Sequence, residues 1–190
     1  IGDVASDIRN NGHVVVNGTI SSARFENRGT IAAPGYGKIL ADTMELIAGA
    51  IEPGGDLWVM PRNHEDATIV HWSGGTLLPD ANGRPPLSVY LMHLRLANRS
   101  LEGALVWMPL GDTLVGDIGP AVELRVRSPW ISDATMYLSP LAGRPRQDPF
   151  INEGMLRLEN TTVAGDSITI VKEGAIVNEG TVRILPIGAS

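Results

Sequence analysis

One C-terminal stretch decides the fold, and it reads Ile151-Asn-Glu-Gly-Met-Leu-Arg-Leu-Glu-Asn-Thr-Thr-Val-Ala-Gly-Asp-Ser-Ile-Thr-Ile-Val-Lys-Glu-Gly-Ala-Ile-Val-Asn-Glu-Gly-Thr-Val-Arg-Ile-Leu-Pro186. It contains short alternations of apolar and polar residues, such as Ile168-Thr-Ile170 and Val182-Arg-Ile184, separated by Asn-Glu-Gly, Ala-Gly-Asp or Glu-Gly. Alternation with a period of two places successive side chains on opposite faces, as in a β-strand. Glycine after Asn or Glu supplies the positive φ of a tight turn. The stretch therefore predicts short strands joined by tight turns.

The same phrase occurs near the start of the chain. Val14–Ile20 and Arg24–Ile31 each read as a strand, a turn with Asn and Gly, and Thr-Ile at the start of the next strand. Together with the two C-terminal copies they form an imperfect internal repeat, whose turn residues are Asn17, Asn27, Asn152 and Asn178. We expect these asparagine side chains to stack and to satisfy neighbouring backbone groups. A single copy has little weight, because Asn-Gly is common in turns.

The repeat is typical of a coil wound from short strands, with about 20 residues per turn. In such a coil each turn bonds to the next, and inward Ile, Val and Leu stack in columns. We therefore predict an all-β protein, with a parallel β-helix as the favoured architecture. An antiparallel sandwich or jelly roll is the alternative, because strands every 8–12 residues or so with turn signals between them fit it too.

The middle of the chain is less regular. Leu87–Met108 is its longest apolar region and alternates like a strand, with a helix as the alternative. Asp80–Pro86 and Ser139–Pro149 contain Gly, Pro and Arg without alternation, which predicts two protruding loops. Gly35–Lys38 is interpreted as a turn. No charge run or linker divides the chain, so we predict one domain over residues 1–190.

Composition excludes several classes of function. The chain has 190 residues, 43% of them hydrophobic and only 5% aromatic, which predicts a core of aliphatic side chains. A net charge of −6 and the lack of any Lys/Arg run argue against nucleic acid and anionic membrane surfaces. No apolar stretch reaches the roughly 18 residues of a membrane-spanning helix. Zero cysteine excludes disulfides and thiolate metal sites, and is compatible with a secreted or surface-exposed bacterial protein. Because the first residue is Ile1 rather than Met, we expect a processed chain or an excised domain.

The phrases Asn17-Gly-Thr-Ile20, Asn27-Arg-Gly-Thr-Ile31 and Ala175–Ile184 resemble the repeats of autotransporter passengers and filamentous-haemagglutinin-like adhesins. The resemblance covers about a third of the chain, over residues 13–31 and 151–184, and matches no family signature residue by residue. It implies a right-handed parallel β-helix on a bacterial surface. Residues 52–150 depart from the regular passenger pattern, and the resemblance supplies no catalytic residue.

Candidate metal-ligating and catalytic residues are scattered. His64 and His71 flank Glu65-Asp66, but zinc needs at least three well-placed ligands and no third is evident. His13 and His93 are expected in strands. Asp112 and Asp117 lie in a Gly-rich segment that could hold calcium, but calcium takes six to eight oxygen ligands, and solvated turn acids are the favoured interpretation. The remaining acids considered for paired-carboxylate hydrolysis are Asp42, Glu45, Glu52 and Asp56. No nucleophile-elbow or phosphate-loop motif is present, so we predict no catalytic residue, no cofactor and no metal.

The four tryptophans are Trp58, Trp72, Trp107 and Trp130. Tryptophan on an outer strand face can stack on sugar rings or anchor an interface. Trp58 and Trp72, together with Tyr90, are a candidate for such a binding surface. The favoured interpretation is that the tryptophans fill the core of an aromatic-poor protein.

Two functions follow from these features. The favoured one is a non-enzymatic, extracellular or cell-surface structural or adhesive β-protein, which forms homo-oligomers or filaments or binds neighbouring molecules such as glycans. The alternative is a carbohydrate-binding or polysaccharide-degrading module of the tail-spike or lyase type, for which carboxylates would cluster beside Trp58 or Trp72.

Overall fold

The computed structural model describes residues 7–52, 54–63, 67–90, 92–127, 134–159 and 168–185. These residues form strands and no helix, which confirms the all-β prediction. The strands are β1 (Ile8–Asn10), β2 (His13–Val15), β3 (Gly18–Asn27), β4 (Thr30–Ala32), β5 (Tyr36–Leu46), β6 (Ala50–Glu52), β7 (Asp56–Met60), β8 (Thr68–Trp72), β9 (Thr76–Leu77), β10 (Leu87–Tyr90), β11 (Met92–Leu96), β12 (Glu102–Met108), β13 (Asp112–Val115), β14 (Val122–Arg127), β15 (Ala134–Ser139), β16 (Phe150–Asn152), β17 (Met155–Glu159), β18 (Ile168–Lys172), β19 (Ile176–Asn178) and β20 (Thr181–Leu185). His64, Glu65, Asp66 and Trp130 fall outside the described residues.

Every strand pairing in these ranges is parallel. The pairings join 18 strands in one sheet that does not close on itself, and β16 and β19 form a second sheet. The antiparallel sandwich is therefore wrong, because its neighbouring strands would run in opposite directions. The helix alternative for Leu87–Met108 is also wrong, since that segment contains β10, β11 and β12.

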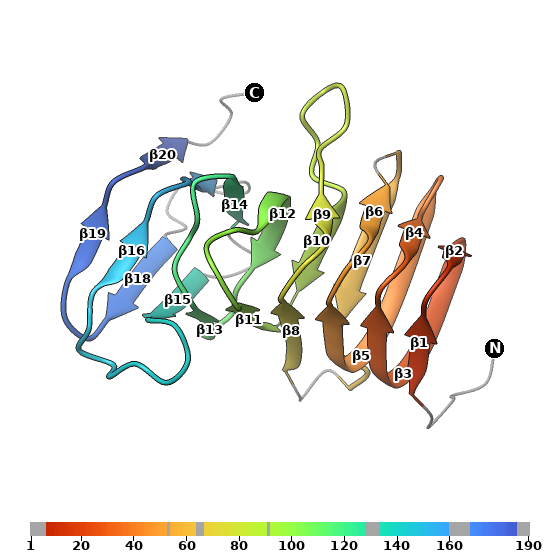
Figure 1. The fold of residues 1–190 in the computed structure, drawn as a ribbon, viewed down its shortest axis with the longest axis horizontal. Helices are drawn as coiled ribbons and strands as arrows, with labels where there is room; N and C mark the ends of the chain where they lie inside the picture. The colour runs from red at the N-terminus through yellow and green to blue at the C-terminus, as the bar shows by residue number, and fades with distance from the viewer. Residues whose placement is uncertain are drawn as a thin grey trace.

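Strands that are not consecutive in the chain pair with each other, so the strands line up in three runs (Figure 1). The first run is β1, β3, β5, β8, β11, β13, β15 and β18. The second is β3, β5, β7, β10, β12, β14, β17 and β20, in which β3 and β5 take part again because they are long. The third is β2, β4, β6, β9 and β12, and β16 pairs with β19 separately. The distance along the chain between register partners varies. It is 17 residues from Asn10 to Asn27, and twice as many from Ala134 to Ile168.

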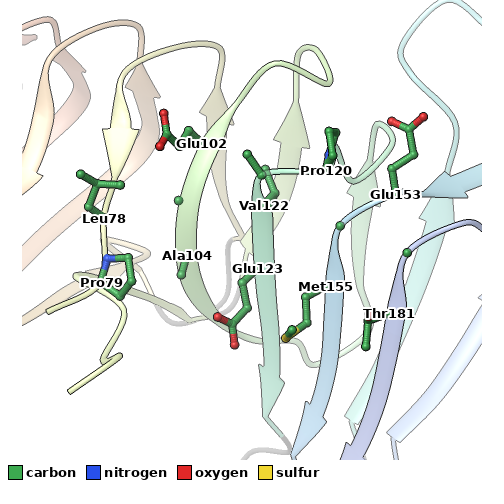
Figure 2. A pocket seen from close by; sticks show the side chains of 14 residues that line it. Leu78, Pro79, Glu102, Ala104, Pro120, Val122, Glu123, Glu153, Met155 and Thr181 are labelled. Atoms are coloured by element: carbon green, nitrogen blue, oxygen red, sulfur yellow. The ribbon is translucent and has the colours of Figure 1, made fainter. Parts of the chain in front are cut away.

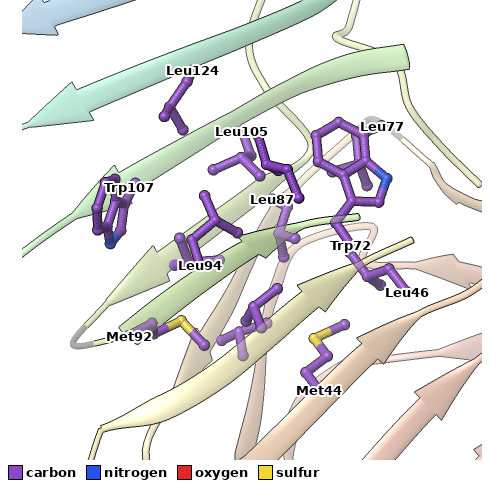
Figure 3. Close-up of a cluster of buried hydrophobic side chains, with 14 of the residues drawn as sticks. Met44, Leu46, Trp72, Leu77, Leu87, Met92, Leu94, Leu105, Trp107 and Leu124 are labelled. Carbon is purple, nitrogen blue, oxygen red and sulfur yellow. The ribbon is translucent and has the colours of Figure 1, made fainter. Parts of the chain in front are cut away.

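Inward side chains stack in columns along these runs, as the sequence predicts. In the first run, the aligned residues are Phe25, Met44, Val70, Leu94, Leu114 and Leu138, all of them buried. In the second, they are Ile39, Val59, Val89, Trp107, Val126 and Leu158. Figure 3 shows part of this core, with Trp72 and Trp107 among aliphatic side chains. Full burial of each such side chain contributes about 1.5–3 kcal/mol to folding.

The asparagine repeat forms two ladders rather than one. Asn10 donates from Nδ2 to Oδ1 of Asn27 at 2.8 Å, and Asn152 donates in the same way to Asn178 at 2.7 Å. The expected stacking is therefore confirmed for Asn152 and Asn178, whereas Asn27 stacks on Asn10, which lies outside the repeat phrases. The ladders occupy different positions, because Asn10 and Asn27 end first-run strands whereas Asn152 and Asn178 end β16 and β19. Asn17 is exposed in the turn between β2 and β3 and belongs to neither ladder.

Both predicted loops lie between strands. Asp80–Pro86 connects β9 to β10 and is tied to β14 by Arg125, whose Nη2 donates to the Gly83 carbonyl at 2.6 Å. The loop predicted at Ser139–Pro149 begins one residue later, because Ser139 is the last residue of β15. It leads to β16 and is held by Arg144, whose guanidinium lies 3.2 Å from the Asp117 carboxylate.

Candidate assembly surface

Trp58, Trp72 and Tyr90 do not form the candidate surface that the sequence suggests. Trp72 is fully buried, because Thr68, Val70 and Trp72 share the inward face of β8. Its register partners are Leu46 and Leu96, which are also buried. The tryptophan therefore fills the core, and the three-residue surface is wrong.

Trp58 lies on the outer face of β7, half-buried between the inward Leu57 and Val59. Its register partner on β5 is Lys38, whose Nζ lies 5.2 Å from the centroid of the Tyr36 ring. Tyr36 is 50% exposed. The turn expected at Gly35–Lys38 is wrong from Tyr36 onward, because β5 begins there and turns its aromatic ring outward. Tyr90 is half-buried on β10.

The predicted acids Asp112 and Asp117 have structural partners. Asp112 is buried, and its Oδ2 accepts hydrogen bonds from the backbone N–H groups of Met92 and Leu110 at 2.8 and 3.3 Å. Burial raises the pKa of the Asp112 carboxyl above its ordinary value, against the opposing effect of these two hydrogen bonds. Asp117 accepts a hydrogen bond from Ile151 N at 2.9 Å. Its carboxylate also lies 3.4 Å from the guanidinium of Arg99, in addition to its ion pair with the loop residue Arg144.

The histidines do not gather with acids into a metal site. His71 aligns with Glu45 on one side and Arg95 on the other, and His93 accepts a hydrogen bond at Nδ1 from Thr113 N at 3.3 Å. Among the described residues, no three His, Cys, Asp or Glu side chains are grouped so that they could hold a metal ion.

A shallow groove of about 440 Å³ runs across the start of β12, β14, β17 and β20 (Figure 2). Three carboxylates line it, from Glu102, Glu123 and Glu153, and Figure 2 shows them spread along the groove. Glu123 lies 2.7 Å from the Arg125 guanidinium, and Glu153 lies 2.9 Å from that of Arg99. Glu123 and Glu153 are therefore each engaged in an ion pair with an arginine.

None of the acids singled out from the sequence lines this groove. Its three carboxylates were missed because they are far apart in the chain and come together only through the pairings of β12 with β14 and of β14 with β17. Trp58 and Trp72 are also absent from its lining, so the groove lacks the aromatic platform that sugar binding would use.

The strongest unpartnered surface is the C-terminal edge formed by β18, β19 and β20. Within the described residues, each of these strands pairs on one side only, with β15, β16 and β17 respectively. The inward columns therefore end at side chains that lack a neighbouring strand. Ile176, Val182 and Ile184 are 49%, 44% and 76% exposed, whereas their register partners Phe150, Leu156 and Leu158 are buried.

The opposite edge consists of β1, β2 and the first half of β3. These strands also pair on one side only in the described residues, with β3, β4 and β5. Their inward side chains Ile8, Val14 and Ile20 are partly buried and pack against the core. Among the described residues, the strands at both ends therefore have one unpaired edge each, which needs a cap or a partner.

The part of the chain that the structure describes contains no helix suited to crossing a membrane. No protein-family model matches the chain, and no significant similarity links it to a curated protein or a solved structure.

Proposed function

We propose that this chain is a non-enzymatic structural or adhesive protein of the extracellular space or cell surface, which assembles through its exposed strand edges. The observation that carries the proposal is the C-terminal edge, where Ile176, Val182 and Ile184 continue the columns of the core into solvent. An unpaired strand edge with an apolar inward face is a template for another chain.

The proposal includes a finer description of the fold as a right-handed parallel β-helix. Support comes from the uniformly parallel pairings and from the three runs of strands that the chain visits in turn. Parallel strands joined by crossovers are right-handed in nearly all known cases. The repeat phrases that resemble autotransporter passengers and filamentous-haemagglutinin-like adhesins support the same description. In such a coil every turn bonds only to its neighbours, so the two ends are the natural places for association.

The test is the state of the purified chain as its concentration rises. Negative-stain electron microscopy and light scattering are expected to reveal filaments or regular oligomers. The matched variants are Ile184→Lys at the C-terminal edge and Leu78→Lys in the β9–β10 connection, both replacing exposed side chains. We expect Ile184→Lys to reduce assembly and Leu78→Lys to leave it unchanged. A chain that stays monomeric at every concentration would overturn the proposal.

Carbohydrate binding is the second candidate, and one observation favours it. Tyr36, Lys38 and Trp58 lie together on the outer faces of β5 and β7, with a lysine over an aromatic ring. Exposed aromatic rings stack on sugars, and a lysine can bind an acidic sugar. Titration with an acidic and a neutral oligosaccharide would quench tryptophan fluorescence in the native chain but not in Trp58→Ala. Absence of quenching by both ligands, and of turnover of a polysaccharide panel, would remove this candidate.

A further inference from the structure

The two strand edges match each other in sequence and spacing. A single constant shift along the chain takes Ile8 to Ile170, Val14 to Ile176 and Ile20 to Val182. The same shift aligns Gly12 with Gly174, Gly18 with Gly180 and Thr19 with Thr181. Within the chain, by contrast, the number of residues between register partners on neighbouring strands varies by a factor of two, because the connections differ in length.

The matched residues also play matched structural parts. The shift aligns β1 with β18, β2 with β19 and the start of β3 with β20. The strand ends that it aligns agree to within one or two residues. The partners of Ile8, Val14 and Ile20 are Phe25, Ile31 and Ile39, and those of Ile170, Ile176 and Val182 are Met136, Phe150 and Leu156. All six partners are buried, so all six matched side chains face inward.

The outward positions are compatible too. The shift brings Val171 opposite Arg9, Glu173 opposite Asn11, Glu179 opposite Asn17 and Arg183 opposite Ser21. On the inward face it brings Lys172, the register partner of the buried Leu138, opposite the buried Asn10. No two like charges face each other in this alignment of residues 8–22 with 170–184. Directly opposed like charges would weaken strand pairing.

We propose that copies of this chain stack head to tail, with β18, β19 and β20 of one copy pairing in parallel with β1, β2 and β3 of the next in this register. The inference rests on the proposed function and specifies its partner as a second copy of the chain. The contact sets an inward apolar side chain of one copy against one of the next at each of the three strands and covers the exposed Ile176 and Val182. In the first two runs this junction is displaced by two residues along the strands, because the columns that begin at Ile8 and Ile20 end at Lys172 and Ile184. Because the two surfaces differ, the contact is heterologous. Such a contact produces a filament, unless the rotation between successive copies closes the assembly into a ring.

Cysteine cross-linking tests the register, and the native chain has no cysteine to interfere. Val15 and Val177 are opposed by the shift, lie on the outer faces of β2 and β19, and are 55% and 36% exposed, so cysteine there should not disturb the core. Adjacent paired strands lie about 4.8 Å apart, within the Cα separation that a disulfide spans.

The experiment compares Val15→Cys, Val177→Cys and their mixture under mild oxidation, with circular dichroism to check folding. The mixture is expected to form a covalent dimer, and neither variant is expected to do so alone. An off-register mixture of Val15→Cys with Tyr137→Cys, another exposed outward position, controls for random collision. Equal cross-linking in this control would overturn the register.

The outcomes separate the inference from the proposed function. Dimers from Val177→Cys alone would indicate contact between two C-terminal edges, and dimers from Val15→Cys alone would indicate contact between two N-terminal edges. Either result, or filaments in electron microscopy without the mixed cross-link, would overturn head-to-tail stacking while leaving self-assembly intact. Monomers in both experiments would overturn both proposals.

Discussion

Asn10 donates a hydrogen bond from Nδ2 to Oδ1 of Asn27, its register partner on the adjacent strand. Asn27 is buried and donates in turn to the carbonyls of Gly29 and Ala48, so one side chain ties together three successive turns of chain. Leu46 occupies the next position in register, and the ladder ends there.

Replacing Asn27 by alanine should destabilise the protein by about 1–3 kcal/mol, because the substitution leaves buried polar groups of its neighbours unpaired. Urea unfolding followed by circular dichroism measures the loss. Asn17→Ala is the matched control from the same repeat phrase. Since Asn17 is exposed, its loss should change stability by no more than about 0.5 kcal/mol. Equal effects of the two substitutions would contradict the assignment of the ladder.

Gly49 should tolerate no side chain. Its φ of 78° is in the left-handed region, and a Cβ placed there would overlap the carbonyl oxygen of Gly29. Gly49→Ala is expected to cost more than about 1 kcal/mol, because the left-handed backbone is strained for alanine and the neighbouring turn cannot move away. Gly35→Ala, where a Cβ meets nothing within 4 Å, is the control and should be nearly neutral in the same unfolding assay. A stable Gly49→Ala protein would show that the two turns are less closely packed.

The strands and turns of this fold could be predicted from the sequence, because alternation and glycine are local signals. The direction of pairing could not be predicted, since the residues of a strand such as His13–Val15 do not indicate whether the neighbouring strand runs parallel. The matching ends illustrate the limit. The likeness of Gly18-Thr-Ile20 to Gly180-Thr-Val182 is visible in the printed sequence, but only the pairings reveal that both segments lie at open edges.

The sequence leaves the orientation of Trp72 open, because both faces of its strand carry apolar residues. In Thr68-Ile-Val-His-Trp72, alternation leaves either the Ile69 face or the Val70 face as the buried one. The structure buries Thr68, Val70 and Trp72, and the Thr68 hydroxyl donates to the Ala41 carbonyl at 2.6 Å. A buried threonine with a backbone partner has no signature in a single sequence.

The placement of the tryptophans predicts unequal effects of truncation. Trp72→Ala should cost about 3–5 kcal/mol, because it empties a large volume in the core. Trp58→Ala should cost clearly less, because Trp58 is half-buried on an outer face. Urea unfolding of both variants checks the order, and the fluorescence of Trp58→Ala should lose its more red-shifted component. The reverse order of stabilities would contradict the inward orientation of β8.

Asp112 predicts a specific dependence of stability on pH. Burial raises the pKa of its carboxyl in the folded protein above the ordinary value of 3.8. The folded state therefore binds the proton more tightly than the unfolded state. The resulting stabilisation is fully present below the unfolded pKa and is lost as the pH rises through the folded pKa.

Asp112→Asn removes this titration and keeps one side-chain oxygen as acceptor for the N–H groups of Met92 and Leu110. The unfolding free energy of the variant, compared with that of the native chain, should therefore shift in the variant's favour as the pH rises above the ordinary value of 3.8. Asp56→Asn, at an exposed position on β7, controls for the general effect of removing a carboxylate. If the native chain instead gained stability over Asp112→Asn as the pH rose, Asp112 would have to be stabilised as a carboxylate by its two N–H donors more than burial penalises it.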